Sequence, residues 1–594
     1  MTTKTPTIEQ ELSTLLGQAF TTLHLPAELG QVQRSQRPDL ADYQCNGAMV
    51  AAKKYQAGNP FSVAENVLKV VTDCQWIDKI TVVKPGFINI RICPIKLSSV
   101  LQQTAQADSW GIIDSSLSNT RVIIDSGGAN VAKSMHVGHL RTAIIGEALR
   151  RIFLAKGYEV ITDVHLGDWG TQMGMLIEGV RKRQPDLIYF DADYHGEYPK
   201  ESPVTIQDLE TIYPQESGLC KTDKAAAEKA RQATAELQNG RPGYRALWRH
   251  FVEVSIATLK RDYAALNVHF DWWKGESDAD PYIEPSIKLL QEKGVATVDQ
   301  GALIVPILDD DGEPLMPPLM LRKSDGAVMY ATTDIATLYE RIFLEKANII
   351  LYVVDGRQQQ HFRQVFAVAD MMGMNANTTY EHDYFGTVNG KDGKPFKTRS
   401  GGVMKLDDLI GMATDEAKKK LSQSQLNQNF PQQEQDDIAR KVAISALKFA
   451  DLRNHRIKDY TFDLEKFSEF EGKTGPYLLM QVARMKSILR KAESTGLRAG
   501  KYRLGDSDIE KSLVLKLLDF SRVIDVTIEK RAPHFLCEHL YQLAQLFSSF
   551  YQQQHILNEA DKDRQASLLA LVAICLSQLE YGVNLLGIET LDRM

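Results

Sequence analysis

The sequence is poor in cysteine, and the few cysteines that it has are scattered. Its 594 residues include six, and no two of them form a C-x-x-C pair. This spacing excludes a zinc ribbon and a disulfide framework, and it is typical of a protein from a reducing compartment. We therefore expect no zinc site and no disulfide bond.

Long apolar runs are also missing. The first 20 residues carry acids and amides where a signal peptide would need an unbroken apolar stretch. No run of membrane-spanning length is evident, so we expect a cytoplasmic protein that binds no membrane.

Strong charge of one sign is absent too: the net charge is −7. An RNA partner would therefore have to bind local basic surfaces.

The pattern along the chain predicts several domains. Residues 1–117 are typical of a small α/β unit that closes with a hairpin around Pro85-Gly86. Residues 118–435 follow the strand, glycine turn, helix, strand order of a Rossmann-type core, interrupted by a polar insertion at about 181–320. Residues 436–594 are helical throughout. The expected fold is multidomain α/β with a C-terminal all-α bundle.

Two local helices follow from apolar spacing. The segment DYQCNGAMVAAKKY (42–55) suits a helix. The helix that begins near residue 139 places four apolar positions on one face, namely Leu140, Ile144, Ala148 and Ile152. A second strand-turn-helix unit is expected at 346–372.

The strongest chemical signal is GGANVAKSMHVGH (127–139), which lies between a strand and a helix. His136 and His139 are three residues apart at the helix start, beside free backbone N–H groups that attract phosphate. A helix N-terminus disfavours protonated imidazole, so we expect neutral hydrogen-bond donors to a triphosphate. Gly138 leaves room for a flat base. An H-x-x-H metal pair or two surface histidines are the alternatives, and the flanking strand and helix favour the nucleotide site.

The motif H-V-G-H resembles the H-I-G-H signature of class I aminoacyl-tRNA synthetases. Together with HLGDWGTQMG (165–174), the run GANVAKSMHVGHLR resembles the arginyl-tRNA synthetase family in particular. The resemblance implies that Asn130 and His139 contact L-arginine. Gly128 and Ala129 stand where many members have Ser-Pro, and Val164 stands where many have Asn. One side-chain contact to the amino acid is therefore absent or supplied differently.

A basic loop, GKDGKPFKTRSGG (390–402), stands where that class has its K-M-S-K-S loop. Clustered cations suit the charge that develops on an α-phosphate and a departing pyrophosphate. By itself the segment is also compatible with a solvated basic loop. The resemblance assigns Lys397, Arg399 and Ser400 to ATP binding and implies that Lys133 compensates for the degenerate match.

A guanidinium is best matched by a carboxylate that accepts two hydrogen bonds. In YATTDIATLYERI (330–342), Tyr330 and Asp334 lie one helical turn apart. Position alone makes Asp334 a first-turn residue that compensates the helix dipole. The resemblance instead implies that Tyr330 and Asp334 line an arginine pocket, together with Gln358.

The helical third resembles the family's anticodon-binding domain, and residues 1–117 resemble its extra domain, which contacts the tRNA D-loop. A basic face with an aromatic suits a phosphate backbone and a stacked base, although such a face is also common on solvated helices. Phe87 is equally compatible with a hairpin core. The candidate tRNA-binding residues are Phe87, Asn89, Tyr477, Gln481, Arg484, Lys491, Tyr551 and Met594.

The resemblance implies an arginine–tRNA ligase. Its substrates would be ATP with Mg²⁺, L-arginine and tRNA(Arg), with no zinc or organic cofactor, and tRNA would be needed already for adenylate formation. The resemblance to this family also implies a monomer. One alternative is an H-x-G-H nucleotidyltransferase that acts on a small molecule without tRNA. Another is a non-catalytic RNA-binding paralogue.

Overall fold

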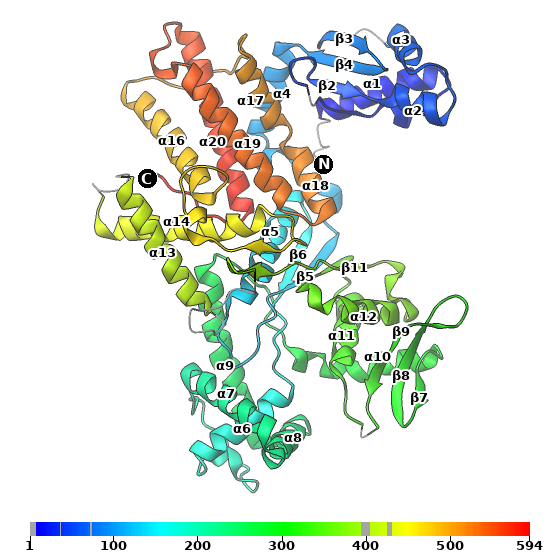
Figure 1. Ribbon diagram of the computed structural model, residues 1–594, viewed down its shortest axis with the longest axis vertical. Coiled ribbons are helices and arrows are strands. Elements are labelled where there is room, and N and C mark those ends of the chain that lie inside the picture. Colours follow the sequence, from blue (N-terminus) through cyan, green and yellow to red (C-terminus); the bar gives the residue numbers. More distant parts are fainter. Residues whose placement is uncertain (1–6, 36, 72–73, 325, 394–403, 425–429) are drawn as a thin grey trace.

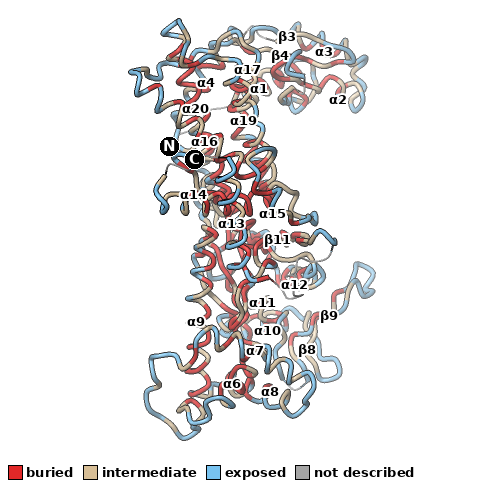
Figure 2. The backbone as a smooth tube through the Cα atoms, turned by 60° about the vertical axis from the view of Figure 1, so that its left-hand side comes forward, coloured by how far each residue is buried: buried red, intermediate tan, exposed pale blue. Residues whose placement is uncertain are grey.

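The computed structural model describes residues 7–594 except 36, 72–73, 325, 394–403 and 425–429. Figure 1 shows an elongated molecule with the N-terminal unit near one end and helices α6–α9 at the other. In Figure 2 buried residues run through its whole length. The mixed α/β architecture with a helical C-terminal region agrees with the expected fold class.

The N-terminal unit is a four-stranded antiparallel sheet in the order β1-β2-β4-β3, covered by three helices. Its hairpin around Pro85-Gly86 is confirmed. The helix expected at 42–55 is partly wrong, because Tyr43–Cys45 forms a strand that pairs with β4 before the helix begins. The elements are α1 (Ile8–Thr22), β1 (Val32–Arg34), β2 (Tyr43–Cys45), α2 (Gly47–Lys54), α3 (Pro60–Val70), β3 (Ile77–Val83) and β4 (Phe87–Ile92).

The central sheet is parallel, with strand order β11-β10-β5-β6. The two strand-turn-helix units predicted from the sequence supply its middle strands, so their carboxyl ends meet at one edge, where open sheets bind ligands. The elements are β5 (Arg121–Ser126), α5 (Leu140–Lys156), β6 (Glu159–Asp163), β10 (Ile349–Val353), α12 (Gln359–Met371) and β11 (Thr379–His382).

Helix α5 is buried on nearly every side. The four apolar positions predicted to face the core are buried, but so are polar residues on other faces, including Arg141 and Glu147. The helix contacts the sheet on one side and α14, α18 and α20 of the helical region on the other. Enclosure by two layers, rather than an amphipathic pattern, explains this burial.

The expected insertion consists of two structural units. Four helices pack together, and a separate three-stranded antiparallel sheet packs against α11 and α12 (Figure 1). The first unit comprises α6 (Thr171–Arg183), α7 (Ile206–Thr222), α8 (Lys224–Gln238) and α9 (Pro242–Ala265). The second comprises β7 (Thr297–Asp299), β8 (Ala302–Leu308) and β9 (Pro314–Arg322), beside α10 (Asp280–Glu292) and α11 (Tyr330–Tyr339).

The C-terminal region is helical, as expected. A short parallel pair of β12 (Val388–Asn389) and β13 (Tyr460–Thr461) joins it to the core. Helix α4 (Pro94–Gln106) connects the N-terminal unit and packs on α17 and α20. The other elements are α13 (Leu406–Gln423), α14 (Gln432–Leu452), α15 (Leu464–Phe467), α16 (Gly475–Ser494), α17 (Asp508–Leu518), α18 (Phe520–Lys530), α19 (His534–Gln553) and α20 (Lys562–Leu585).

The expectation that no segment reaches membrane-spanning length is wrong for α20. Among the described residues, this helix alone is long and apolar enough by length and composition to cross a membrane. Within the molecule 61% of its most apolar window is buried, and it packs against α16 and α19. The central helix of a helical bundle passes the same test, because it is apolar all round.

Candidate active site

The two histidines of the H-V-G-H motif form a stacked pair at the start of α5. Their ring centroids lie 3.9 Å apart, with 25° between the ring planes. The backbone N–H of Gly138 donates to Nδ1 of His136 at 3.0 Å, and the N–H of His136 donates to Nδ1 of His139 at 3.2 Å. Both Nδ1 atoms are thus acceptors. In the neutral ring the proton then sits on Nε2, which becomes the available donor.

The electrostatics of this pair favour neutral rings. Burial lowers the pKa of His139 to about 3, with further lowering from His136 and Lys133. Burial, followed by the charge on Lys133, also lowers the pKa of His136. The direction agrees with the expectation from the sequence, but burial is the larger cause. Both side chains can therefore act as neutral donors near pH 7.

The glycine between the histidines leaves room for the observed position of the His136 ring. A Cβ at Gly138 would lie 2.7 Å from Cε1 of His136, closer than carbon atoms approach. The exposed backbone at this position is open to a ligand. Lys133 lies on the same loop, with Nζ 4.6 Å from the ring centroid of Tyr213 in α7.

The loop after β6 connects the histidine loop to the acidic residues. On one side Gly167 exchanges hydrogen bonds with the histidine loop: its N–H donates to the carbonyl of Ala129, and the N–H of Val131 donates to its carbonyl. A Cβ at Gly167 would lie 2.3 Å from Oδ1 of Asn130, which explains the glycine. On the other side the N–H of Glu276 donates to the carbonyl of Leu166. A single segment thus supports both halves of the candidate site.

Asp334 has a partner that the sequence did not indicate. Its Oδ2 lies 2.5 Å from Nε2 of His361 in α12, and the ring of His361 lies 4.8 Å from that of Tyr330. Asp334 is part-buried, whereas Tyr330 is 63% exposed. Gln358 is exposed at the turn before α12. Helices α11 and α12 thus bring Tyr330 and Asp334 together with His361, whose contacts only the packing of the two helices reveals.

Glu276 is the second residue that carries no signal in the sequence. Burial is the main reason why its pKa is raised to about 7; the charges of Asp168 and Asp334 add to the shift, and His165 opposes it. A part-buried carboxyl whose pKa is raised further by a neighbouring carboxylate is suited to a cationic ligand. No sequence motif surrounds Glu276, so only its tertiary neighbours identify it.

Beneath these acids lies a buried charge cluster. Nη2 of Arg341 lies 2.7 Å from both Asp125 and Asp163, at the carboxyl ends of β5 and β6. Burial alone would lower the pKa of His165, but its interactions with Asp163 and Asp125 raise it to about 9. Asp125, Asp163 and His165 lie close enough together to hold a metal ion. The guanidinium of Arg341 and the protonated ring that the raised pKa of His165 favours already supply positive charge to the two carboxylates.

The described residues at the two ends of the basic loop make defined contacts. Lys397, Arg399 and Ser400 lie outside the described part of the chain. Lys391 forms an ion pair with Asp463 at 3.2 Å at the start of the loop. After it, the N–H of Val137 donates to the carbonyl of Met404 at 3.1 Å. The exit of the loop is therefore hydrogen-bonded to the histidine motif.

The remaining predicted residues differ in exposure. Gly128 is exposed, and Ala129 is buried with Asn130 next to it. Val164 is fully buried, and its Cγ2 would lie 2.9 Å from a Cβ at Gly127. Val164 therefore packs in an apolar environment. It stands where many family members have Asn, and its side chain offers no polar contact to the amino acid.

The candidate tRNA-binding residues fall into buried and accessible groups. Asn89 is buried and accepts a hydrogen bond from Gln44 at 2.8 Å, and Gln481 is 1% exposed. Gln481 therefore does not share the open face of α16 on which it was expected, although Lys491 is exposed there. Phe87, Tyr477, Arg484, Tyr551 and Met594 are half-buried.

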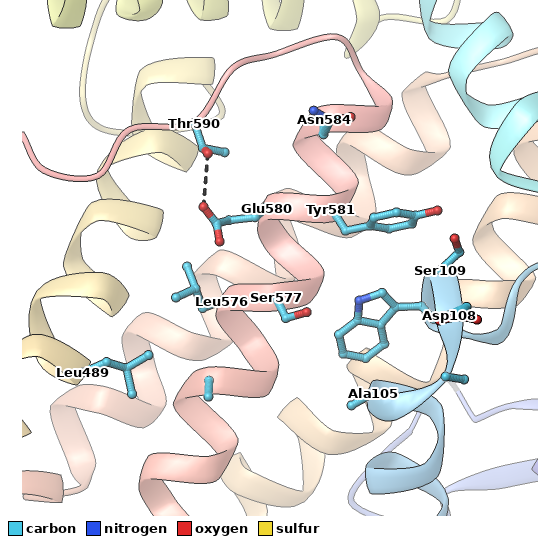
Figure 3. A pocket seen from close by; sticks show the side chains of 13 residues that line it. Ala105, Asp108, Ser109, Leu489, Leu576, Ser577, Glu580, Tyr581, Asn584 and Thr590 are labelled. Carbon is cyan, nitrogen blue, oxygen red and sulfur yellow. Dashed lines mark hydrogen bonds between the residues drawn. The ribbon is translucent and has the colours of Figure 1, made fainter. Parts of the chain in front are cut away.

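A hollow of about 690 Å³ lies elsewhere, among the end of α4, α16 and α20. Figure 3 shows Glu580 and Tyr581 projecting from α20 into it, and Thr590 donates a hydrogen bond to Glu580 at 3.1 Å. None of the predicted site residues lines this hollow.

Comparison with protein families identifies the chain. A model described as tRNA synthetases class I (R), catalytic domain, matches residues 97–464. The Arginyl tRNA synthetase N terminal domain matches residues 7–92, and the DALR anticodon binding domain matches residues 478–594. The parallel sheet with its histidine pair is thus that of a class I aminoacyl-tRNA synthetase, an enzyme of the ligase class.

Curated relatives match over nearly the full length. An arginine–tRNA ligase from Hyphomonas neptunium is 49% identical over 99% of this chain and 100% of its own. One from Alkaliphilus oremlandii is 44% identical over 98% and 99%. The chain therefore belongs to the arginyl-tRNA synthetase family.

Solved structures share the fold. The arginyl-tRNA synthetase of Plasmodium falciparum superposes with a TM-score of 0.82 at 24% identity, covering all of both chains. That of Thermus thermophilus gives a TM-score of 0.79 at 22% identity, covering 99% of this chain and all of the other. The architecture is retained although most side chains differ.

Proposed function

We propose that the chain activates L-arginine with ATP and transfers it to tRNA(Arg); its curated relatives are named arginine–tRNA ligases. The observation that carries this proposal is the loop after β6. It bonds to the histidine loop through Gly167 and to Glu276 through Leu166. A site for a triphosphate and a site for a guanidinium are thereby built on a common segment. Nothing in the structure favours a nucleotidyltransferase that lacks a tRNA substrate.

In this proposal the acidic residues bind the side chain of arginine. Asp334 and Glu276 receive the guanidinium, and His361 orients the Asp334 carboxylate. Tyr330 covers the site from the solvent side, and the cluster around Arg341 keeps the deeper acids neutralised. The carboxylate and amino group of the substrate then lie toward Asn130, Gln358 and His139.

The first step transfers an adenylyl group. An oxygen of the arginine carboxylate bonds to the α-phosphorus of Mg-ATP, and the bond to the departing pyrophosphate breaks. The Nε2–H groups of His136 and His139 donate to the phosphate oxygens, where negative charge grows. Lys133, Lys397 and Arg399 supply positive charge, and Ser400 supplies a hydroxyl. No covalent intermediate with the enzyme is needed, because positioning and charge stabilisation lower the barrier.

In the second step a hydroxyl of the 3′-terminal adenosine attacks the arginyl carbonyl and releases AMP. By analogy with the class this is the 2′-hydroxyl. Residues 1–117 contact the D-loop, residues 118–435 form the catalytic domain, and residues 436–594 bind the anticodon. Gly128 and Ala129 border the amino acid, and Gly138 borders the base of ATP.

The remaining expectations also belong to this proposal. Magnesium arrives with ATP, and neither zinc nor an organic cofactor takes part. The enzyme acts as a monomer in the cytoplasm, without a membrane partner. Binding of tRNA precedes or accompanies adenylate formation.

Pyrophosphate exchange into ATP tests the proposal. Exchange should require arginine and should appear only when tRNA(Arg) is present. Lysine and citrulline serve as controls for guanidinium recognition. Exchange without tRNA would contradict the tRNA requirement, and exchange that ignored arginine would contradict the assignment itself.

A further inference from the structure

Arg141, two residues after His139, links three parts of the molecule. Its Nη1 donates to the carbonyl of Gly386 at 2.7 Å and to that of Lys458 at 3.2 Å. Its Nε donates to Asp451 of α14 at 3.0 Å. The side chains of Arg141 and Asp451 are 2% and 0% exposed. The start of α5 is thereby joined to the segment after β11 and to the helical region.

Aromatic rings hold the guanidinium in one orientation. It lies 5.2 Å from the ring centroid of Tyr460 and 5.6 Å from that of Phe385. The hydroxyl of Tyr460 donates to Asp451 at 3.1 Å. Nη2 of Arg141 is buried with no hydrogen-bond partner among the described residues. An arginine at this place is thus fixed by its plane as well as by its charge.

The segment that Arg141 holds leads directly into the basic loop. We call residues 385–391 the entry arm. After Gly386, the N–H of Thr387 donates to Asp459 at 2.6 Å, β12 pairs with β13, and Lys391 forms its ion pair with Asp463. The exit of the loop pairs with residues 135–137. Both ends of the loop are therefore positioned against the start of α5, the entry through Arg141 and the exit through backbone hydrogen bonds.

We propose that Arg141 is a positioning residue for adenylate formation, which holds the entry arm in register with the histidine pair while Asp451 anchors it. The inference rests on the proposed function. Buried ion pairs often add little net stability, because desolvation offsets attraction. The test of the proposal is therefore a change in the rate of adenylate formation in a variant that still folds. A displacement of about 1 Å in such a support lowers reaction rates by up to about 100-fold.

Arg141→Lys is the test variant, because an ammonium keeps the charge but cannot reproduce the planar fork that reaches both Asp451 and Gly386. Arg564→Lys is the matched control. Arg564 bonds to Glu510, a buried acid of α17, at 3.0 Å and does not touch the entry arm. Arginine-dependent exchange is measured with saturating tRNA, well below the melting temperatures of both variants.

We expect Arg141→Lys to lower kcat by about 10- to 100-fold and to leave KM for arginine within about twofold of wild type. Arg564→Lys should keep kcat within about twofold. Equal losses of kcat in both variants, or wild-type kcat in Arg141→Lys, would overturn the inference. If Arg141→Lys fails to fold, Asp451→Asn replaces it with the same criteria. Absence of arginine-dependent exchange in the wild type would instead refute the proposed function.

Discussion

Oδ2 of Asp334 and Nε2 of His361 lie 2.5 Å apart, across the contact between α11 and α12. The carboxylate that the sequence assigned to arginine is therefore held by a histidine that the sequence did not indicate. Because Oδ2 is held by this hydrogen bond, the second oxygen of the Asp334 carboxylate points in a fixed direction. This relationship makes the acidic site open to direct tests.

Asp334→Asn should raise KM for arginine by roughly 30-fold or more, because loss of one member of a part-buried charge pair weakens binding by about 2 kcal/mol or more. Steady-state exchange kinetics with tRNA measure the effect. Glu228→Gln, on the exposed face of α8, is the control and should leave KM unchanged. A KM for Asp334→Asn within threefold of wild type would remove Asp334 from the pocket.

Two variants of His361 separate hydrogen bonding from packing. His361→Leu should raise KM for arginine about tenfold, because the carboxylate loses a hydrogen bond of the stronger, charged kind. His361→Gln keeps an N–H donor and should lie much closer to wild type. Equal KM values for both variants would show that the ring contact with Tyr330, and not the hydrogen bond, is what matters.

Arginine binding should depend on pH through Glu276. Its pKa is raised to about 7, chiefly by burial, and a guanidinium binds the ionised carboxylate. KM for arginine should therefore fall about tenfold between about pH 6 and pH 8. Glu276→Gln should abolish this dependence and raise KM at the upper end. A KM of the wild type that stayed constant over this range would contradict the assignment.

The same shift predicts an effect on stability. The unfolded carboxyl ionises near its ordinary pKa of 4.5, whereas the folded one remains protonated to about 7. The contribution of Glu276 to the free energy of unfolding is thus fully present below 4.5 and is lost as the pH rises through 7. Without arginine, Glu276→Gln should unfold at a higher temperature than wild type in mildly alkaline buffer, and at a similar temperature near pH 4.5.

His136→Ala should lower kcat of exchange by about 100-fold, the usual loss when one donor to a developing oxyanion is removed. His136→Gln should retain more activity, because its amide nitrogen can stand near the position of Nε2. His195, an exposed residue before α7, provides the control. A kcat for His136→Ala equal to that of His195→Ala would exclude a role for the imidazole in the reaction.

Lys491→Ala should weaken tRNA binding without changing exchange at saturating tRNA. Removal of one cation that binds a phosphate reduces the slope of log K against log salt concentration by about 0.7 to 0.9. Binding titrations at several salt concentrations measure this slope. Lys288→Ala, on the exposed face of α10, should leave the slope unchanged. An identical slope for Lys491→Ala would place tRNA away from this face of α16.

Much of the fold follows from local signals in the sequence. Glycine turns between apolar strands and periodic helices indicate β5, α5, β10 and α12, and Pro85-Gly86 indicates the β3–β4 hairpin. These signals depend on a few neighbouring residues, so they can be recognised without knowing how the rest of the chain folds. The histidine motif was found in the same way and was assigned to a triphosphate, whereas the assignment of Asp334 to arginine rested on the family resemblance.

Other features depend on partners that are distant in sequence. Tyr43–Cys45 becomes a strand through pairing with β4, and α5 is buried on nearly every side because two layers enclose it. Glu276 and His361 carry no local signature, and Arg141 stands in the run GANVAKSMHVGHLR without a sign of its contacts. Burial raises the pKa of Glu276, a helix contact pairs His361 with Asp334, and long-range hydrogen bonds hold Arg141. The sequence by itself determined the order of strands and helices and the position of the motifs. The tertiary structure decided the protonation of Glu276, the orientation of Asp334 and the contacts of Arg141. Desolvation and hydrogen bonding depend on neighbours that only folding brings together.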